Sequence, residues 1–249
     1  MYDLVFPFTD IKIPGPKSYQ YISASTRFLL TSADELSGGP HVLSYFAADV
    51  VGNRNNAQRF PMYLDKQAPE TSHSFSMPNY QGFDTLYISP STAPELTSED
   101  DASGVQNLRY RLDSGDFETY TQAILVDSEG FHSVEFYAEA QVNNREQSKI
   151  IEFYVGNTPP VTNTMYSSKA TFDPNKNMRV IPRRASIFLA AFDEQTGLQE
   201  LRYSINGEEP VPSSDPIQGF ESNETLNIQI IATDKVQNRS TETLKLFVQ

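Results

Sequence analysis

Histidines are the first residues to weigh as catalysts or metal ligands, and this sequence has only three of them. His41 and His132 occupy equivalent places before two similar strand-like segments, and His73 stands apart from both. Zinc sites need ligands at short, regular spacings, usually with cysteine, and this chain has no cysteine. We therefore interpret the histidines as structural residues, and the sequence predicts no metal site built on them.

Carboxylates form the second group with chemical potential. Residues 99–101 are consecutive acids, Glu-Asp-Asp, and Asp113, Asp116 and Asp127 follow them. Oxygen ligands of this kind suit Ca²⁺, but the spacing matches no EF-hand or comparable acidic motif. Ca²⁺ binding stays an open alternative to a solvated acidic loop, and we predict no cofactor.

Motifs for covalent or phosphate chemistry are absent from the sequence. No segment reads as a nucleophile elbow, a phosphate-binding glycine loop or a dinucleotide-binding fingerprint. Carboxylate pairs that could act as general acid and base are abundant, but they fall in turns or on alternating strand positions. We therefore predict that the protein is not an enzyme.

Aromatic side chains are better candidates for binding, because the chain has 13 Tyr and 16 Phe. Most of them follow the alternation of buried strand positions. Four lie nearer to loops and make up the predicted binding surface: Tyr80, Phe83, Tyr120 and Phe220.

The overall charge limits the partners. The 249 residues include 19 Lys and Arg against 32 Asp and Glu, a formal charge of −13, and most of the excess falls between residues 70 and 159. Phosphate binding needs clustered Lys and Arg, so we predict no nucleic-acid partner, whereas a basic protein would be attracted. No apolar run reaches the roughly 18–20 residues of a membrane span. The first residues do not resemble a signal peptide, so an exported protein would have lost its signal.

A repeated unit must position these side chains. Three segments share one pattern: YFAADVVGNR at residues 45–54, FYAEAQVNNR at 136–145 and IIATDKVQNR at 230–239. Their reference alanines, Ala47, Ala138 and Ala232, are 91 and 94 residues apart. Internal repetition at this period indicates one domain type used several times.

A second block supports this register. SGVQNLRYRLD at residues 103–113 recurs as TGLQELRYSIN at 196–206, 93 residues further on. The first copy lacks about two strands, 25 residues, that the second copy has between Val105 and Glu129. Either the first copy is short or the sequence omits a hairpin after Gly38. Losing two strands would expose core at about 25 cal/mol per Å², so we favour the omitted hairpin.

Pro-containing segments separate the copies, because proline ends strands and stiffens short linkers. The predicted domains are residues 1–69, 70–159 and 160–249.

The apolar residues recur with a period of two, as in Val134, Phe136 and Ala138, which is typical of half-buried strands. Short strands in units of about 90 residues predict seven-stranded immunoglobulin-like sandwiches. The expected fold class is all-β, with three tandem immunoglobulin-like β-sandwiches in an elongated array.

The turn inside the repeated motif has a structural interpretation. Asn53, Asn144 and Asn238 close it, and we expect Asn there because it tolerates positive φ. Asp49 and Asp234, four residues earlier, are expected to accept hydrogen bonds from turn amides.

The same residues carry a family likeness. SGVQNLRYRLDSG from residue 103, with GFHSVEFYA at 130–138, resembles bacterial Ig-like repeats of the spirochaete outer-membrane type. AADVVGN at 47–53 resembles the terminal signature of those repeats. The third copy, with LRYSING at 201–207, is also similar to the Ig-like domain at the C-terminus of chitobiases. The resemblance implies modules of adhesins, secreted enzymes or periplasmic scaffolds.

We therefore predict a non-catalytic, exported bacterial protein at the cell surface, associated with the outer membrane, or in the periplasm. It would act as a spacer, scaffold or adhesion module that binds another protein. Two alternatives stay open. One is a carbohydrate-binding accessory region of a secreted enzyme, with a glycan as partner. The other is a fibre or sheath subunit that associates through exposed edge strands.

Overall fold

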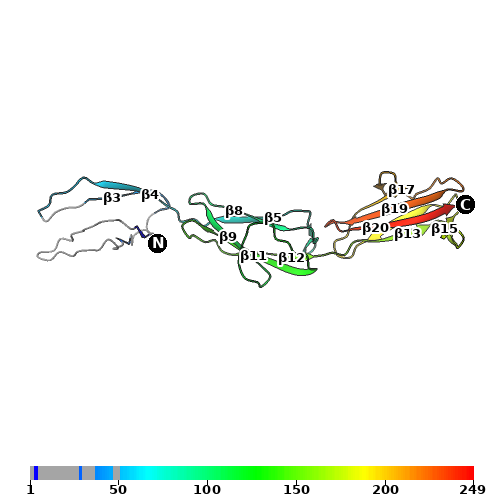
Figure 1. Cartoon of the computed structure of the whole chain (residues 1–249), viewed down its shortest axis with the longest axis horizontal. Helices are drawn as coiled ribbons and strands as arrows, with labels where there is room; N and C mark the ends of the chain where they lie inside the picture. The colour runs from blue at the N-terminus through cyan, green and yellow to red at the C-terminus, as the bar shows by residue number, and fades with distance from the viewer. Residues whose placement is uncertain (1–2, 5–27, 30–36, 47–50) are drawn as a thin grey trace. The chain divides into compact units, whose positions relative to one another are not determined.

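Strands and turns make up the whole of the chain that the computed structural model describes, which is residues 3–4, 28–29, 37–46 and 51–249 (Figure 1). This confirms the all-β prediction. By backbone contacts the chain divides into two compact units. The first comprises Met1–Pro69, Asp100–Gln106 and Glu139–Arg145, and the second comprises Glu70–Glu99, Asn107–Ala138 and Glu146–Gln249.

The first repeat contributes two described strand pairs. They are β1 (Asp3–Leu4) with β2 (Phe28–Leu29), and β3 (Gly39–Tyr45) with β4 (Gln58–Leu64). β3 begins directly after Gly38, where we expect either a short copy or an omitted hairpin, and that choice stays a prediction. Ala47 and Asp49 lie outside the described residues.

The middle sandwich, residues 70–155, has two sheets. Its strands are β5 (Glu70–Phe75), β6 (Tyr80–Gln81), β7 (Leu86–Ile88), β8 (Pro94–Glu99), β9 (Val105–Leu112), β10 (Glu118–Thr119), β11 (Gly130–Ala140) and β12 (Lys149–Val155). The larger sheet has the order β10-β9-β11-β12-β7-β6, and β5 pairs with β8 in the smaller sheet. β7 runs parallel to β12, while β11 and β12 form an antiparallel hairpin.

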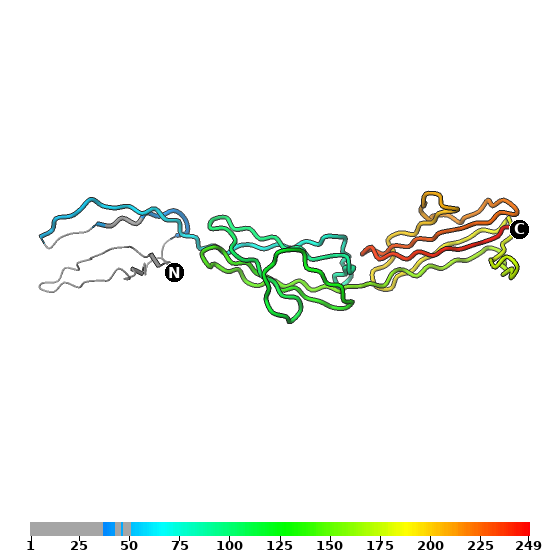
Figure 2. The backbone as a smooth tube through the Cα atoms, in the orientation of Figure 1, coloured from blue at the N-terminus to red at the C-terminus, as the bar shows by residue number. Residues whose placement is uncertain are grey.

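The C-terminal sandwich, residues 161–248, repeats this arrangement and is drawn from yellow-green to red in Figure 2. Its strands are β13 (Val161–Tyr166), β14 (Thr171–Asp173), β15 (Met178–Ile181), β16 (Ile187–Phe192), β17 (Leu198–Ile205), β18 (Val211–Pro212), β19 (Thr225–Asp234) and β20 (Arg239–Val248). The larger sheet has the order β14-β15-β20-β19-β17-β18, and β13 pairs with β16. β15 runs parallel to β20, as β7 does to β12.

Each of these two sandwiches is immunoglobulin-like, since two sheets of mostly antiparallel strands enclose one core. The hairpin register is also shared: Gly39 pairs with Leu64 in the first repeat, and Gly130 pairs with Val155 in the middle sandwich. The division into three domains stays a prediction.

The alternation of side chains builds the two cores. Val134, Phe136 and Ala138 are at most 1% exposed in the middle sandwich, and Ala232 is fully buried in the C-terminal one. The cores are separate clusters, because no buried residue is common to both. Tyr137, which alternation predicts on the wet face, is only 7% exposed, because the ring of Phe117 covers it at a centroid distance of 5.0 Å.

The turn of the repeated motif takes positive φ one residue earlier than we expect. The φ values are +90° at Gly52, +66° at Asn143 and +73° at Gln237. The interpretation of Asn53, Asn144 and Asn238 through positive φ is therefore wrong. These asparagines need another reason.

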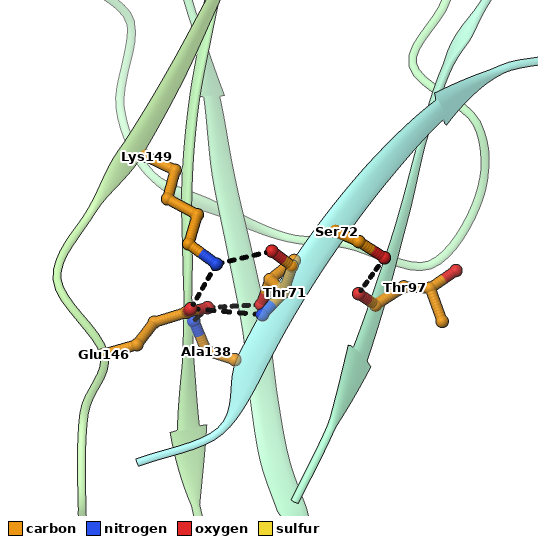
Figure 3. A network of polar contacts seen from close by, with 6 residues as sticks. All are labelled: Thr71, Ser72, Thr97, Ala138, Glu146 and Lys149. Atoms are coloured by element: carbon orange, nitrogen blue, oxygen red, sulfur yellow. Dashed lines mark hydrogen bonds and ion pairs between the residues drawn. The ribbon is translucent and has the colours of Figure 1, made fainter.

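A buried carboxylate ties the first strand of the middle sandwich to its last hairpin (Figure 3). Glu146 accepts hydrogen bonds from the amide of Ala138 at 2.7 Å and from the amide and hydroxyl of Thr71, the amide at 3.1 Å. Lys149 Nζ lies 3.3 Å from Glu146 Oε2 and donates to the Thr71 carbonyl at 2.6 Å. Glu146 and Lys149 therefore hold β5 against β11, and this fixes the position of the smaller sheet over the core.

Candidate functional site

Four aromatic residues lie side by side across the larger sheet of the middle sandwich. Phe131 of β11 pairs with Tyr154 of β12, Tyr154 pairs with Tyr87 of β7, and Tyr87 pairs with Tyr80 of β6. They project from the side of the sheet opposite the core, since their neighbours Phe153, Val155 and Ile88 are buried. We name these four residues the aromatic row.

The rings of the aromatic row contact one another in sequence. Phe131 and Tyr154 meet edge to face at a centroid distance of 5.0 Å, and Tyr154 and Tyr87 are tilted at 5.8 Å. Tyr87 and Tyr80 stack at 6.4 Å, and Lys235 Nζ lies 4.0 Å from the Tyr80 ring centroid. Phe131 is 75% exposed, so the row presents at least one wide apolar ring to a partner.

An open pocket of about 420 Å³ adjoins the row at Phe131. Its lining includes three carboxylates, Asp84, Asp113 and Glu152. The turn between β6 and β7 that supplies Asp84 also carries Phe83, whose ring is fully exposed. Acidic groups beside aromatic faces suit a ligand that combines positive charge with apolar surface, such as Arg or Lys side chains.

One arrangement at this pocket has the outline of a hydrolase triad. Ser128 Oγ lies 3.3 Å from His132 Nε2, and His132 Nδ1 lies 3.1 Å from Asp113 Oδ2. However, Nε2 is also 2.9 Å from the Ser128 carbonyl oxygen, which can only accept. A ring that donates from Nε2 to this carbonyl has no lone pair there with which to activate the hydroxyl. His132 holds a loop here and is not a base for Ser128.

Asp113 is part of the same loop and has a shifted pKa. Partial burial raises the pKa of its carboxyl, but the hydrogen bond from the Ser133 amide, at 2.9 Å, and the neighbouring His132 outweigh burial. The net pKa lies below the ordinary value of 3.8. Asp113 therefore serves as the hydrogen-bond acceptor of a turn.

The predicted binding residues separate into two groups. Tyr80 belongs to the aromatic row, and Phe83 lies exposed in the next turn. Phe220 is only 5% exposed and belongs to the core of the C-terminal sandwich. Tyr120 packs against the middle core and its hydroxyl accepts from the Leu96 amide at 3.1 Å. These two rings pack in or against the sandwich cores, and ligand binding by any of the four residues stays a prediction.

Sequence reasoning missed Phe131, Tyr154 and Tyr87 as partners of Tyr80. Alternation places Phe131 and Tyr154 on the wet face of their strands, so an aromatic residue there was a usable signal. Their adjacency needed the strand order, since β6 and β7 lie far from β11 in sequence.

The acidic loop residues bind backbone amides. Asp100 Oδ1 accepts from the amides of Ala102 at 3.2 Å and Gly104 at 2.7 Å. Asp193, its equivalent in the C-terminal sandwich, accepts from Thr196 and Gly197. Among the residues that the structure describes, no group of three or more His, Asp or Glu side chains is placed to hold a metal ion.

Asn144 and Asn238 bind the segment that enters their own sandwich. Asn144 Nδ2 donates to the carbonyls of Asp65 at 3.0 Å and Gln67 at 2.8 Å. Asn238 Nδ2 donates to the Gly156 carbonyl at 2.9 Å. Asp65 and Gly156 occupy equivalent places at the ends of successive copies, so this contact is repeated with the domain.

Asp234 supports the second of these contacts. Its carboxylate is fully buried and accepts from the amides of Val236 at 3.0 Å and Asn238 at 2.7 Å. It also accepts from Asn238 Nδ2 at 2.9 Å and from the Thr196 hydroxyl at 3.0 Å. The prediction that Asp234 binds turn amides is confirmed.

Comparison with known proteins gives fold-level likenesses of low score. No protein-family model matches the sequence, and no curated protein matches it. Among solved structures, the chain is similar to a tetra-tandem repeat in the extending region of a large adhesion protein. That match has 15% identity and a TM-score of 0.28, and it covers 90% of this chain and 58% of that one. A second similar structure is mouse clustered PcdhgC3 EC1-3, with 14% identity, a TM-score of 0.27, and coverage of 92% and 82%. Scores this low establish neither a shared family nor a shared function.

The described residues contain no helix of the length and apolarity that crossing a bilayer requires.

Proposed function

We propose that this chain is a non-catalytic repeat protein that binds another protein through the aromatic row and spaces or presents it. The location we propose is the surface or periplasm of a bacterium. The single observation that carries the proposal is the row itself, four contacting rings on the wet face of a sheet beside an acidic pocket.

Cross-strand aromatic pairs stabilise a sheet, but polar pairs can do so as well, so folding alone does not require this row. Polar residues satisfy the wet face of a sheet, so a contiguous set of aromatic rings on that face favours an interaction surface. Aromatic residues concentrate where proteins bind, because they cover a large area with little loss of conformational freedom. The adjoining carboxylates favour a basic partner surface over an acidic one.

The spacer part of the proposal is supported by the repeated asparagine contact. Asn144 and Asn238 each donate a hydrogen bond to the segment that leads into their own sandwich. These bonds restrain the backbone where one copy continues into the next. We expect small-angle scattering to show an extended particle, and a compact globule would contradict the spacer role.

The binding part is tested with a matched pair of variants. Purified chain is cross-linked to proteins of its native envelope, and recovered proteins are identified by mass spectrometry. We expect the double variant Phe131→Ala, Tyr154→Ala to lose the partner, because both rings leave the row. The control Phe172→Ala removes a comparably exposed ring, 62% exposed, from the C-terminal sandwich and should keep the partner. Equal recovery with the double variant would contradict the proposal.

A glycan array separates this proposal from the carbohydrate-binding alternative. Specific sugar binding that is lost in Tyr80→Ala or Phe83→Ala would favour an accessory region of a secreted enzyme. Absence of sugar binding, together with recovery of a protein, favours the adhesion role.

A further inference from the structure

We propose that the outer face of the β13–β16 sheet binds a second copy of this chain through the same face. The face consists of the outward side chains of the two strands, and we name it the apolar face: Val161, Asn163, Met165, Phe188, Ala190 and Phe192. This site lies on a different sandwich from the aromatic row and does not depend on the proposed function.

The apolar face is unusual because antiparallel sheets normally turn polar residues outward. The cross-strand pairs are Val161 with Phe192, Asn163 with Ala190 and Met165 with Phe188. The exposed fractions of its four large apolar side chains are 69% for Val161, 55% for Met165, 41% for Phe188 and 64% for Phe192. No charged side chain interrupts them on this face.

The middle sandwich supplies the contrast. At the same positions its smaller sheet carries Glu70 with Glu99, Ser72 with Thr97 and Ser74 with Glu95. The topology and register are those of β13 and β16, so folding accepts charged and polar residues at all six places. The apolar side chains of the C-terminal sandwich are therefore not required by the topology, and a contiguous exposed apolar patch of this kind marks an interaction site.

A second copy fits this face because the face is complementary to itself. On the outward side of β16 the small Ala190 lies between Phe188 and Phe192. A ring from another copy can enter where the side chain is small, as facing layers interdigitate when large residues meet small ones. Asn163 lies at the centre, and its carboxamide can both donate to and accept from the same group related by a two-fold axis.

Charge also favours a second copy at this place. The C-terminal copy, residues 160–249, has 11 acids and nine bases and is nearly neutral, whereas residues 70–159 carry 15 acids and four bases. Two copies can therefore approach through the apolar face with little repulsion, while association through the middle sandwich would bring like charges together.

The exposed area of the apolar face sets the expected affinity between the two copies. Phenylalanine rings cover roughly 150–250 Å² each, so the exposed parts of Phe188 and Phe192, together with those of the smaller Val161 and Met165, leave on the order of 300–400 Å² per copy. A stable interface takes about 800 Å² per partner, so the apolar face forms its centre and the surrounding polar residues form its rim. We expect a dissociation constant of about 10–100 µM.

The test is sedimentation equilibrium of the full chain from about 1 µM to about 500 µM, a range that brackets this constant. We expect a monomer–dimer equilibrium. The double variant Phe188→Glu, Phe192→Glu installs the residues that the middle sandwich already has, and it should weaken dimerisation at least tenfold, as expected for two central anchors. A second variant, Val161→Glu with Met165→Ser, should act in the same direction if the first fails to fold.

The control is Phe172→Glu, which adds a charge at an exposed ring on the other sheet of the same sandwich. It should dimerise like the unmodified chain. A chain that stays monomeric at every concentration overturns the proposal. So does an open-ended series of larger assemblies, which would favour a fibre. Equal loss in Phe172→Glu and in Phe188→Glu, Phe192→Glu also overturns it, because the effect would then be general charge.

Discussion

The middle and C-terminal sandwiches have the same strand order and the same pairing, yet the aromatic row and the apolar face lie on different sheets of the sandwich. The middle sandwich carries its aromatic row on the larger sheet, where the C-terminal one has Thr225, Phe247, Val180 and Thr171 at the paired positions. The C-terminal sandwich carries its apolar face on the smaller sheet, where the middle one has three glutamates.

This difference separates what folding requires from what it leaves free. Inward positions are apolar in both sandwiches, with Phe136 and Phe153 in one and Ile228 and Ile230 in the other at most 1% exposed. Outward positions vary without changing the register. The two sandwiches therefore share the core pattern and differ at the surface, which allows each of them a different contact.

The largest effect should come from removing a core ring. Phe136→Ala leaves a cavity in the middle sandwich and should cost about 3–5 kcal/mol in the free energy of unfolding. Because the cores are separate, hydrogen exchange followed by mass spectrometry should show lost protection in β9, β11 and β12. Protection in β17, β19 and β20 should stay unchanged. The counterpart Ile230→Ala should give the reverse pattern, and loss of protection in both sandwiches from either change would contradict two independent cores.

The second-largest effect concerns the turn of the repeated motif, which differs between the two sandwiches. Asp234→Ala removes a fully buried acceptor of four hydrogen bonds, and the equivalent residue of the middle sandwich is already Ala140. Leaving buried amides unpaired should cost about 3 kcal/mol in the C-terminal sandwich. Chemical unfolding measures the loss, and the control Ala140→Ser should change little. A loss below about 1 kcal/mol would mean that the turn amides find other partners.

The sequence predicts the sandwiches well because the burial of their core residues follows from the alternation of apolar and polar residues along each strand. Val134, Phe136 and Ala138 are buried as a period of two requires, and the repeat spacing gives the register of the hairpins. Tyr120 and Phe220 pack in or against the cores although they are near loops in the sequence, because closeness to a loop does not measure burial. The aromatic row and the apolar face depend on which strands pair, and β7 reaches β12 through a parallel contact that no local pattern encodes.

The buried carboxylate of Figure 3 offers a third comparison. Glu146→Gln replaces one carboxylate oxygen by an NH₂ group, so one of the backbone amides of Thr71 and Ala138 loses its acceptor and Lys149 loses its ion pair. We expect a loss of about 2 kcal/mol in the unfolding of the middle sandwich. At the equivalent place the C-terminal sandwich has Ser240, whose buried hydroxyl has no hydrogen-bond partner. Ser240→Ala should therefore leave the free energy of unfolding unchanged or raise it slightly. If Glu146→Gln and Ser240→Ala lose stability to a similar extent, the loss does not come from the hydrogen bonds of Glu146.

The smallest expected effect is on the pH dependence of stability. Asp113 in the middle sandwich and Asn206 in the C-terminal one occupy the same turn with φ of +53° and +54°. Each side chain accepts a backbone amide at 2.9 Å, from Ser133 and from Asn227. Only the carboxyl titrates, and its pKa is lowered in the folded state.

A lowered pKa means that Asp113 stabilises the fold above its unfolded value of 3.8, and that this stability is lost as the pH falls through the lower folded value. Asp113→Asn should keep the turn and remove this part of the acid sensitivity of the middle sandwich. The difference should be below about 1 kcal/mol, because the side chain is half exposed and screened by solvent. Unfolding of the full chain at pH 7 and pH 3, resolved by sandwich, measures it. The C-terminal sandwich, with its neutral Asn206, provides the internal reference. If the pH dependence of unfolding is unchanged in Asp113→Asn, other carboxylates cause the acid sensitivity.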